Sequence, residues 1–508
     1  MPAPLAALLD ALAAAGIPAH VQGDPAVTIE DIAYDSRKVA PDGLFVALRG
    51  AATDGHRYIP QALDRGAVAA LTEEPVVDPR LRCDVVVPDS RAALAQVAAA
   101  FYGEPSRRLG LVGVTGTKGK TTTSFLIEAL LAVAGHETGL IGTVDLKVGP
   151  RRWPNPVHQT TPESLDVQRF LAEMVAAGVD WAVLETSSHA LETHRVDRCL
   201  YDVAVVTNVT HEHLDFHGTY ENYLAAKAKL LDRFAPEGVK GRPRAAFLNL
   251  DDPGAASLRG RARGVPEYTY GLGPACDVRA EAPAESPAGL RFTLRSPWGD
   301  GDLALPLLGR FNVYNALAAT AVALALGVPL AAVARSLAAF GGVPGRLQRI
   351  DEGQPFLVVV DYAHNPDSLE QVLRLLRALA RGRLIAVFGS AGDRDRAKRA
   401  MMGRVCAALA DYGIFTDEDP RTEDRAAILA EIGAGAAEAG WVAGRDYETI
   451  PDRPAALARA CDLAGPGDVV LLAGKGHENS IEYDGYSIPW DEAAAAREAL
   501  RALGYGAR

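Results

Sequence analysis

A glycine-rich stretch that ends in lysine and threonine is the part of this sequence best suited to binding phosphates. It runs from Gly113 to Thr122 and reads G-V-T-G-T-K-G-K-T-T. In such a loop, backbone N–H groups and the positive end of the next helix face phosphate oxygens. Lys120 would reach the terminal phosphates, and the Thr121 hydroxyl would ligate Mg²⁺. The strict pattern needs glycine at position 114, which is valine here. Three glycines in the turn and the Lys-Thr pair still favour a phosphate loop over an ordinary turn.

The elements expected around this loop are those of an open parallel sheet. Apolar runs predict strands at 109–114, 140–144, 181–184 and 203–206, with a helix at 124–134. One strand ends at Glu185, and another leads to His213. Because ligands bind at the carboxyl ends of strands in such sheets, we expect the loop, Glu185 and His213 to lie along one edge.

The histidines near residue 213 could bind zinc, but their spacing argues against it. His211, His213 and His217 do not form an H-E-x-x-H pattern, and no cysteine lies nearby. A hard Mg²⁺ held by a carboxylate, a hydroxyl, phosphates and one histidine fits better. A helix is predicted at 220–234, in which Lys227 on its own would be an ordinary surface charge.

A second α/β alternation occupies the C-terminal third of the chain. Strands are predicted at 356–360, 384–388, 412–415 and 469–472. Each ends in a charged loop that contains glycine or proline. Four such loops in one register indicate a doubly wound domain with a site at its carboxyl edge.

The N-terminal hundred residues alternate short strands with helices. A helix is predicted at 5–17, and strands are predicted at 28–33, 43–47, 67–71 and 83–87. Asp35, Ser36 and Arg37 follow the first of these strands and alone read as loop residues.

Length and composition exclude several classes of protein. A chain of 508 residues indicates about three domains, and the net charge of −12 argues against a nucleic-acid groove. The five cysteines are far apart and lack metal-ligand spacing, which is typical of a reduced, cytosolic compartment. The run 316–334 carries no charged residue, but it is weakly apolar and is broken by glycine and proline. It predicts two buried helices, at 315–326 and 330–340, rather than a membrane span.

Taken in order, the motifs of this chain resemble those of the Mur ligase family. They span nearly the whole chain: G-x-x-G-T-K-G-K-T-T at 113–122, E-x-S-S-H at 185–189, N-x-T-x-x-H-L-D at 208–215, A-A-K at 225–227, G-R-x-N-x-x-N at 309–315, P-G-R at 344–346 and D-Y-A-H-x-P-D at 361–367. The closing D-P-R at 419–421 and G-K-G-H-E at 474–478 look like those of the member that adds the third peptide residue.

The resemblance implies an α/β protein of three domains. Residues 1–107 would bind a UDP-sugar, and 108–341 would form the central ATP-binding phosphate-loop domain. Residues 342–508 would form a doubly wound, Rossmann-like domain for an amino acid.

The resemblance also implies an activity. A carboxylate of UDP-N-acetylmuramoyl-L-alanyl-D-glutamate would attack ATP to give an acyl phosphate, which the amine of a diamino acid would then displace. This cytoplasmic step of peptidoglycan synthesis would need ATP and Mg²⁺. We expect a monomer with no membrane insertion. The alternatives are another Mur ligase, a folylpolyglutamate synthase, or a phosphate-loop NTPase that works as a switch or motor without ligation.

The site residues implied by the resemblance fall into four groups. ATP would meet Gly116, Thr117, Lys118, Gly119, Lys120, Thr121, Thr122, Asn312, Asn315, Arg346 and Asp361. The UDP-substrate would meet Ser36, Thr160, Thr161, Ser187 and Arg195. The amino acid would meet Arg394, Glu418, Asp419, Arg421, Gly474 and Glu478. Mg²⁺ would be held by Thr121, Glu185, His213 and Lys227, the last as a carbamate. Lys120, Lys227 and His213 would be the catalytic residues.

The identity of the diamino acid stays open at this stage. Arg421 and Arg394 favour meso-diaminopimelate, because a guanidinium can hold its distal carboxylate in a fork. Glu418 and Asp419 instead favour lysine or ornithine, which end in a bare ammonium. If Asp419 pairs with Arg421, the two effects cancel. We rank diaminopimelate first by a narrow margin.

Overall fold

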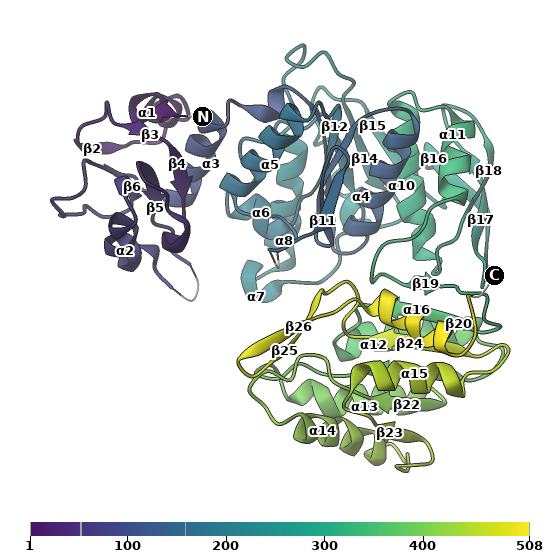
Figure 1. Ribbon diagram of the computed structural model, residues 1–508. Helices are drawn as coiled ribbons and strands as arrows, with labels where there is room; N and C mark the ends of the chain where they lie inside the picture. The colour runs from purple at the N-terminus through teal and green to yellow at the C-terminus, as the bar shows by residue number, and fades with distance from the viewer. Residues whose placement is uncertain (1, 51–52, 158, 507–508) are drawn as a thin grey trace. The chain divides into compact units, whose positions relative to one another are not determined.

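The computed structural model describes residues 2–50, 53–157 and 159–506. The chain forms two compact units. The first comprises Met1–Glu281, Thr293–Gly301 and Tyr314–Ser336; the second comprises Ala282–Phe292, Asp302–Val313 and Leu337–Arg508. Figure 1 shows their elements.

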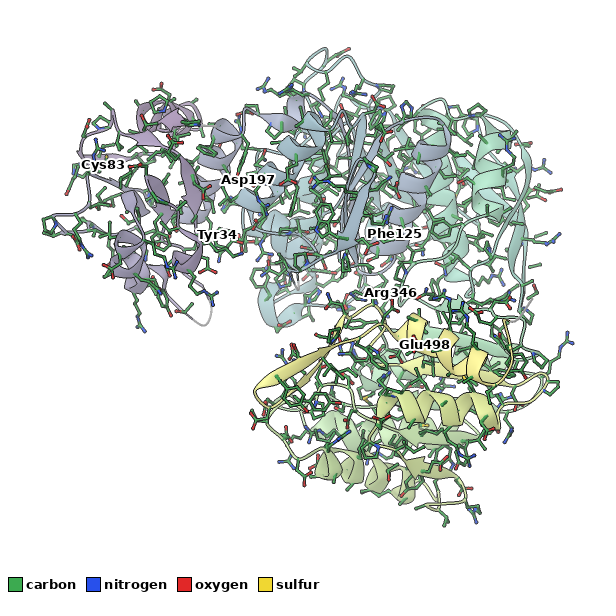
Figure 2. All side chains as sticks on the ribbon, viewed as in Figure 1. Tyr34, Cys83, Phe125, Asp197, Arg346 and Glu498 are labelled. Carbon is green, nitrogen blue, oxygen red and sulfur yellow. The ribbon has the colours of Figure 1, made fainter. Side chains whose placement is uncertain are left out.

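The N-terminal part of the first unit is a five-stranded sheet with helices packed on it. The strand order is β2 (His20–Gly23), β7 (Cys83–Val86), β6 (Ala67–Thr72), β5 (Gly43–Val46) and β4 (Asp31–Ala33). The helices are α1 (Leu5–Ala14), α2 (Ile59–Asp64) and α3 (Ser90–Phe101). The strand predicted at 28–33 is interrupted, because Thr28–Ile29 forms β3 and pairs with β1 (Ala3–Pro4) instead. Tyr34, labelled in Figure 2, donates a hydrogen bond from its hydroxyl to Asp166 of the central part over 2.6 Å.

A second sheet forms the centre of the first unit. The first eight of its eleven strands are, in order, β11 (Arg151–Pro154), β10 (Asp145–Val148), β9 (Thr138–Ile141), β12 (Trp181–Glu185), β8 (Gly110–Thr115), β13 (Val203–Val206), β14 (Ala245–Asn249) and β15 (Glu267–Gly271). The six strands from β9 to β15 run parallel. Strands β8, β12 and β13 are buried along their whole length, which explains their uninterrupted apolar sequences.

Helices connect and cover these strands. They are α4 (Lys120–Val133), α5 (Ser164–Ala176), α6 (Ser188–Glu192), α7 (Leu214–His217), α8 (Tyr220–Ala228) and α9 (Pro253–Ala256). The helix predicted at 220–234 is wrong in its end, since α8 tightens into a 3₁₀ turn over Lys229–Asp232. The strand predicted at 140–144 is also displaced, because the chain leaves the sheet at Gly142 beside the Glu185 side chain.

Further strands and helices follow, with residues divided between the two units. The strands are β16 (Val278–Ser286), β17 (Gly289–Arg295) and β18 (Gly301–Leu305), and the helices are α10 (Phe311–Ala325) and α11 (Leu330–Ala338). Helices α10 and α11 correspond to the two buried helices predicted from the run 316–334, which carries no charged residue. Within the described ranges, no helix is long and apolar enough to cross a membrane.

The second unit contains the doubly wound sheet. Its strand order is β19 (Gln348–Ile350), β20 (Leu357–Asp361), β24 (Val469–Ala473), β21 (Leu384–Phe388), β22 (Tyr412–Phe415) and β23 (Tyr447–Thr449). All but β19 run parallel. The covering helices are α12 (Pro366–Leu379), α13 (Ala397–Leu409), α14 (Arg425–Glu438), α15 (Arg453–Leu463) and α16 (Glu492–Ala502).

Alternate residues of these strands face two separate cores. Val359 and Leu471 pack in one apolar cluster with residues of α12, α13 and α14. Val358 and Val470 pack in another with residues of α15 and α16. Helices therefore cover both faces of the sheet, which is the doubly wound arrangement predicted from the sequence. A two-stranded hairpin, β25 (Ser480–Tyr483) and β26 (Tyr486–Pro489), follows the loop after β24.

Candidate active site

The phosphate loop lies between β8 and α4, at the carboxyl edge of the central sheet. Gly116 has φ of +151°, and a Cβ there would lie 1.8 Å from Thr207 Oγ1. Gly119 has φ of +86°, and a Cβ there would lie 2.4 Å from Asn315 Oδ1. Only glycine fits at these two positions. Helix α4 begins at Lys120, four residues before the predicted start, because the loop itself ends in the helix N-terminus.

The third glycine of the motif has a different role from the one predicted. Gly113 lies inside β8 rather than in the turn, and a Cβ there would lie 2.6 Å from the ring of Tyr201. It allows close packing under the sheet. The irregular spacing at position 114 therefore leaves the loop itself unaffected.

Residues at the end of β13 hold the phosphate loop in place. The Asn208 carbonyl accepts from the Thr117 N–H at 2.8 Å, and its side-chain oxygen accepts from the Lys118 N–H at 2.9 Å. The Thr207 hydroxyl donates to the Lys118 carbonyl at 2.6 Å. The sequence placed Asn208 in a motif but assigned it no role. Asn208 follows β13, which pairs with the strand that leads into the loop. This position in the sequence could have indicated that Asn208 contacts the loop.

Two lysines approach the same backbone oxygen of the loop. Lys120 Nζ donates to the Gly116 carbonyl at 2.8 Å and to the Thr117 carbonyl at 2.9 Å. Lys227 Nζ also donates to Gly116, at 2.8 Å, and lies 4.4 Å from the centre of the Tyr223 ring. Lys227 is 1% exposed, so the reading of an ordinary surface charge is wrong. Burial, together with the charge of Lys120, lowers the pKa of Lys227 well below its usual value.

A buried carboxylate surrounded by hydroxyls lies at the end of β12. Glu185 accepts from Thr121 Oγ1 at 2.9 Å, from Thr143 Oγ1 at 3.0 Å and from the Thr143 N–H at 2.9 Å. Burial raises the pKa of Glu185. Thr143 was not predicted as a site residue, because the sequence placed it inside a strand.

The oxygen donors around Glu185 have the chemistry that a hard cation prefers. Among the residues that the structure describes, no group of three or more histidines, cysteines and carboxylates could hold a metal ion alone. A cation bound here would need other ligands, such as water and phosphate oxygens. The residues present fit Mg²⁺, which usually keeps several such ligands.

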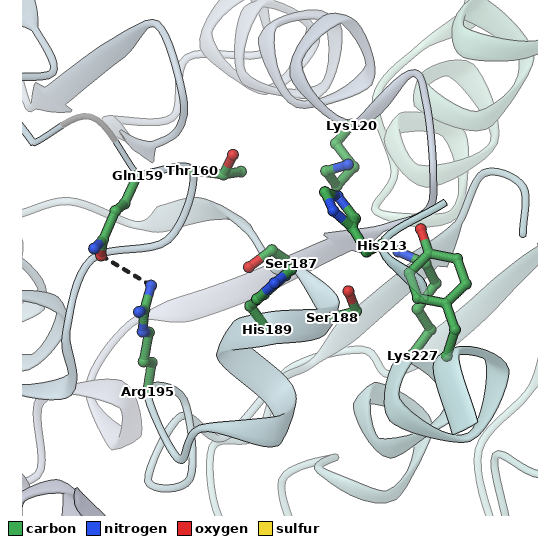
Figure 3. A pocket seen from close by; sticks show the side chains of 10 residues that line it. Lys120, Gln159, Thr160, Ser187, Ser188, His189, Arg195, His213 and Lys227 are labelled. Carbon is green, nitrogen blue, oxygen red and sulfur yellow. Dashed lines mark hydrogen bonds between the residues drawn. The ribbon is translucent and has the colours of Figure 1, made fainter. Parts of the chain in front are cut away.

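A cavity of about 280 Å³ lies beside the phosphate loop. Its lining residues are Lys120, Gln159, Thr160, Ser187, Ser188, His189, Arg195, His213, Tyr223 and Lys227. Figure 3 shows Lys120, His213 and Lys227 on one side and Gln159 and Arg195 on the other, with Ser187 and His189 between them. The cavity brings together residues that the sequence assigned to phosphate, metal and sugar-peptide binding.

Arg195 is oriented toward this cavity by neighbouring polar groups. It donates to Gln159 Oε1 and to the Thr161 carbonyl, both at 2.9 Å, and its guanidinium lies 3.1 Å from Glu163. Burial lowers the pKa of Arg195. The Thr161 hydroxyl donates to the Glu185 carbonyl at 2.7 Å and lies 3.2 Å from Ser187 Oγ.

Three histidines cluster together, and two of them, His189 and His213, line the cavity. The His189 ring centre lies 4.9 Å from that of His213 and 5.5 Å from that of His217. Burial and the two neighbouring imidazoles lower the pKa of His189 to about 4. His213 has φ of +56° and precedes α7, a left-handed conformation that is uncommon for histidine.

Ser36 lies in the N-terminal part of the first unit and is not among the cavity-lining residues. It is buried, and its hydroxyl donates to Gln61 Oε1 at 2.7 Å.

Three residues assigned to ATP belong to the second unit, and that assignment stays a prediction. The Asp361 carboxylate accepts from the N–H groups of Leu347 and Ala363 at 2.8 and 2.9 Å, and burial raises its pKa. Arg346 lies 5.2 Å from the centre of the Tyr362 ring. The side-chain amide of Asn312 donates to the Leu308 carbonyl at 2.7 Å.

The loops after β22 and β24 bring a second group of charged residues together. Lys475 Nζ lies 2.8 Å from Asp419 Oδ1 and 2.7 Å from Glu478 Oε2. Glu418 is buried next to Gly474, where a Cβ would lie 3.2 Å from its Oε2. Four residues predicted to bind the amino acid therefore share one edge of the sheet: Glu418, Asp419, Gly474 and Glu478.

The two arginines assigned to the same site differ in their surroundings. Arg421 pairs with Glu482 of β25, with 2.9 Å between Nε and Oε2. The possibility that Asp419 pairs with Arg421 is wrong, because Asp419 pairs with Lys475. Arg394 lies exposed in the loop after β21, which contacts the loop after β22 through a hydrogen bond from Thr422 Oγ1 to Asp393 at 2.7 Å.

Comparison with known proteins covers nearly the whole chain. Residues 28–102 match the "Mur ligase family, catalytic domain", 114–323 the "Mur ligase middle domain" and 345–476 the "Mur ligase, glutamate ligase domain". The chain is 51% identical over 499 residues to the UDP-N-acetylmuramyl-tripeptide synthetase of Roseiflexus sp. (strain RS-1), covering 96% of this chain and 97% of that one. It is 45% identical over 483 residues to the UDP-N-acetylmuramoyl-L-alanyl-D-glutamate–2,6-diaminopimelate ligase of Geobacillus thermodenitrificans (strain NG80-2), covering 95% and 96%.

A solved structure of a ligase with this second name is also similar. It is 33% identical with a TM-score of 0.66, and the match covers 94% of this chain and 96% of that one. A folylpolyglutamate synthase of Mycobacterium tuberculosis is 19% identical with a TM-score of 0.57, covering 82% of this chain and 95% of that one. At that identity the likeness concerns the fold alone.

Proposed function

Because the chain belongs to the Mur ligase family, we propose that it joins a diamino acid to UDP-N-acetylmuramoyl-L-alanyl-D-glutamate at the expense of ATP. The reaction is a step of peptidoglycan synthesis. The observation that carries the proposal is the shared cavity, where Lys120 and Lys227 line the same space as Ser187 and Arg195. A phosphate donor and a sugar-peptide carboxylate can meet there.

The chemistry proceeds in two steps. The D-glutamate carboxylate attacks the γ-phosphate of ATP, and ADP leaves as an acyl phosphate forms. The amine of the diamino acid then attacks the acyl carbon, phosphate leaves, and the nitrogen loses a proton. Both steps build negative charge on oxygens, which Lys120 and the N–H groups of the phosphate loop stabilise.

Mg²⁺ would be held by Glu185, Thr121, His213 and a carbamate on Lys227. When bound, the cation neutralises phosphate charge. An ammonium at Lys227 would repel a cation, whereas a carbamate supplies an anionic oxygen. The lowered pKa of Lys227 supports this assignment, because an unprotonated amine is the form that reacts with CO₂.

The remaining assignments complete the proposal. Ser36, Thr160, Thr161, Ser187 and Arg195 bind the UDP-substrate. Asn312, Asn315, Arg346 and Asp361 contact ATP, and the charged residues at the carboxyl edge of the second unit receive the amino acid. We further propose domain boundaries at 107/108 and 341/342, and a cytoplasmic, monomeric enzyme.

Release of ADP tests this function directly. The purified protein is incubated with ATP, Mg²⁺, UDP-N-acetylmuramoyl-L-alanyl-D-glutamate and each of several diamino acids, and the UDP-product is identified by mass. We expect turnover only when all components are present. ATP turnover that ignores the UDP-substrate would indicate a switch or motor. Activity with a folate and glutamate would indicate a folylpolyglutamate synthase.

A further inference from the structure

Carboxylates of the chain already bind cations where the amino acid is proposed to bind. Lys475 is already bound by two of them, Asp419 and Glu478, at 2.8 and 2.7 Å. Lys475 is 1% exposed, so this ion pair is shielded from water. Because its ammonium already pairs with two carboxylates of the chain, Lys475 is poorly placed to bind a carboxylate of the substrate.

Arg421 is held in the same way by the hairpin that follows. Its Nε donates to Glu482 Oε2 at 2.9 Å, and its backbone N–H donates to the Glu482 carbonyl at 3.0 Å. Arg421 has φ of +53°, and it forms an isolated parallel bridge with Tyr483. Two backbone contacts thus fix the position of Arg421 beside Glu482. The Arg421 guanidinium could otherwise hold the distal carboxylate of diaminopimelate. In the structure it is paired with the carboxylate of Glu482 instead.

A fourth carboxylate at this edge, Glu418, has one oxygen without a hydrogen-bond partner. Glu418 is 5% exposed, and its Oε2 accepts no hydrogen bond. Burial raises the pKa of Glu418, and the cations Lys398 and Lys475 lower it. A buried carboxylate oxygen without a donor is costly, and an ammonium of the substrate would supply the missing hydrogen bond.

We propose that Glu482, by occupying Arg421, selects a diamino acid whose far end is a bare ammonium, as in L-ornithine or L-lysine, over meso-diaminopimelate. A tethered carboxylate is present at high effective concentration and competes with the distal carboxylate of diaminopimelate. Its negative charge also repels that group and attracts an ammonium. This inference rests on the proposed function. It departs from the names of relatives at 45% identity, which specify 2,6-diaminopimelate.

Steady-state ADP release with the three diamino acids tests the proposal in the full chain. For the unmodified protein we expect kcat/KM for ornithine or lysine to exceed that for meso-diaminopimelate by about tenfold or more, the scale of one charge-assisted hydrogen bond. Glu482→Gln should raise kcat/KM for meso-diaminopimelate by about tenfold, mainly through KM. The double variant Glu482→Gln/Arg421→Ala should lose that gain, because the freed guanidinium is gone.

Asp484→Asn is the matched control, because it removes the same charge two residues away in the exposed turn of the hairpin. It should leave the ratio between the acids unchanged. The proposal is overturned if the unmodified protein uses meso-diaminopimelate better than both other acids, or if Glu482→Gln and Asp484→Asn act alike. If none of the acids supports turnover that depends on the UDP-substrate, the proposed function itself fails, and this inference falls with it.

Discussion

At the scale of single residues, the candidate active site contains two lysines that contact one backbone oxygen. Lys120 and Lys227 both lie 2.8 Å from the Gly116 carbonyl oxygen, although 107 positions separate them in the sequence (227 − 120). The two ammonium groups would repel each other in a buried site. This repulsion adds to the effect of burial and lowers the pKa of Lys227 further.

Lys120→Ala should abolish turnover while the protein stays folded. Lys120 is the side chain that the phosphate loop places to neutralise the transferring phosphoryl group. Losing such a contact costs on the order of a hundredfold or more in rate. ADP release measures the effect, and the circular-dichroism melting curve is the control for folding. Near-normal activity of this variant would contradict the assignment of the loop.

Lys227 should be carbamylated when the protein is prepared in bicarbonate. The uncharged amine adds to CO₂ and loses a proton, which yields an anionic carbamate. Native mass spectrometry should detect one added CO₂, which is absent in Lys227→Ala. That variant should also lose activity, with partial recovery when a short carboxylic acid is added. An unmodified lysine together with full activity of Lys227→Ala would rule out the carbamate.

At the scale of elements, the connection after α6 carries a pH-dependent contact. His194 has φ of +61°, and its Nδ1 lies 2.6 Å from Asp197. This hydrogen bond raises the pKa of His194, although burial opposes it. The pKa is therefore higher in the folded than in the unfolded chain. The contact stabilises fully below the unfolded pKa of about 6.5 and is lost as pH rises through the folded pKa.

His194→Asn should therefore destabilise the first unit more at about pH 5.5 than at about pH 8.5. Asparagine tolerates the left-handed backbone, so the comparison isolates the imidazole. Urea unfolding of both proteins at the two pH values measures the difference. An equal loss at both values would show that the charge of His194 contributes nothing.

At the scale of the whole molecule, the surface predicts a monomer. Among the residues that the structure describes, no helix or strand exposes more than two large apolar side chains. A stable interface between copies needs a contiguous apolar core. Light scattering should give a mass close to 53.6 kDa at micromolar concentration. A mass near twice this value, unchanged on dilution, would contradict the prediction.

The sequence by itself determined the fold class and most of the candidate site. Apolar strands that end in charged, glycine-bearing loops predicted two largely parallel sheets, and the structure has them. The residues assigned to sites at the carboxyl edges stay predictions. The positions of Lys120 and Glu185 followed from this rule, because the ends of apolar strands and the chemistry of the loops after them are read from local patterns. The boundaries that failed, such as the end of α8, depend on contacts with distant parts of the chain.

Only the tertiary structure decided the charge states and pairings. Lys227 looked like a surface charge, because its burial comes from residues far away in the sequence. Arg421 could have paired with Asp419, but a hairpin some sixty residues later brings Glu482 to it, while Lys475 takes Asp419. Desolvation and ion pairing depend on what surrounds a group in space. A motif therefore fixes which chemical groups are present, and the packed fold decides which of them are left to meet a substrate.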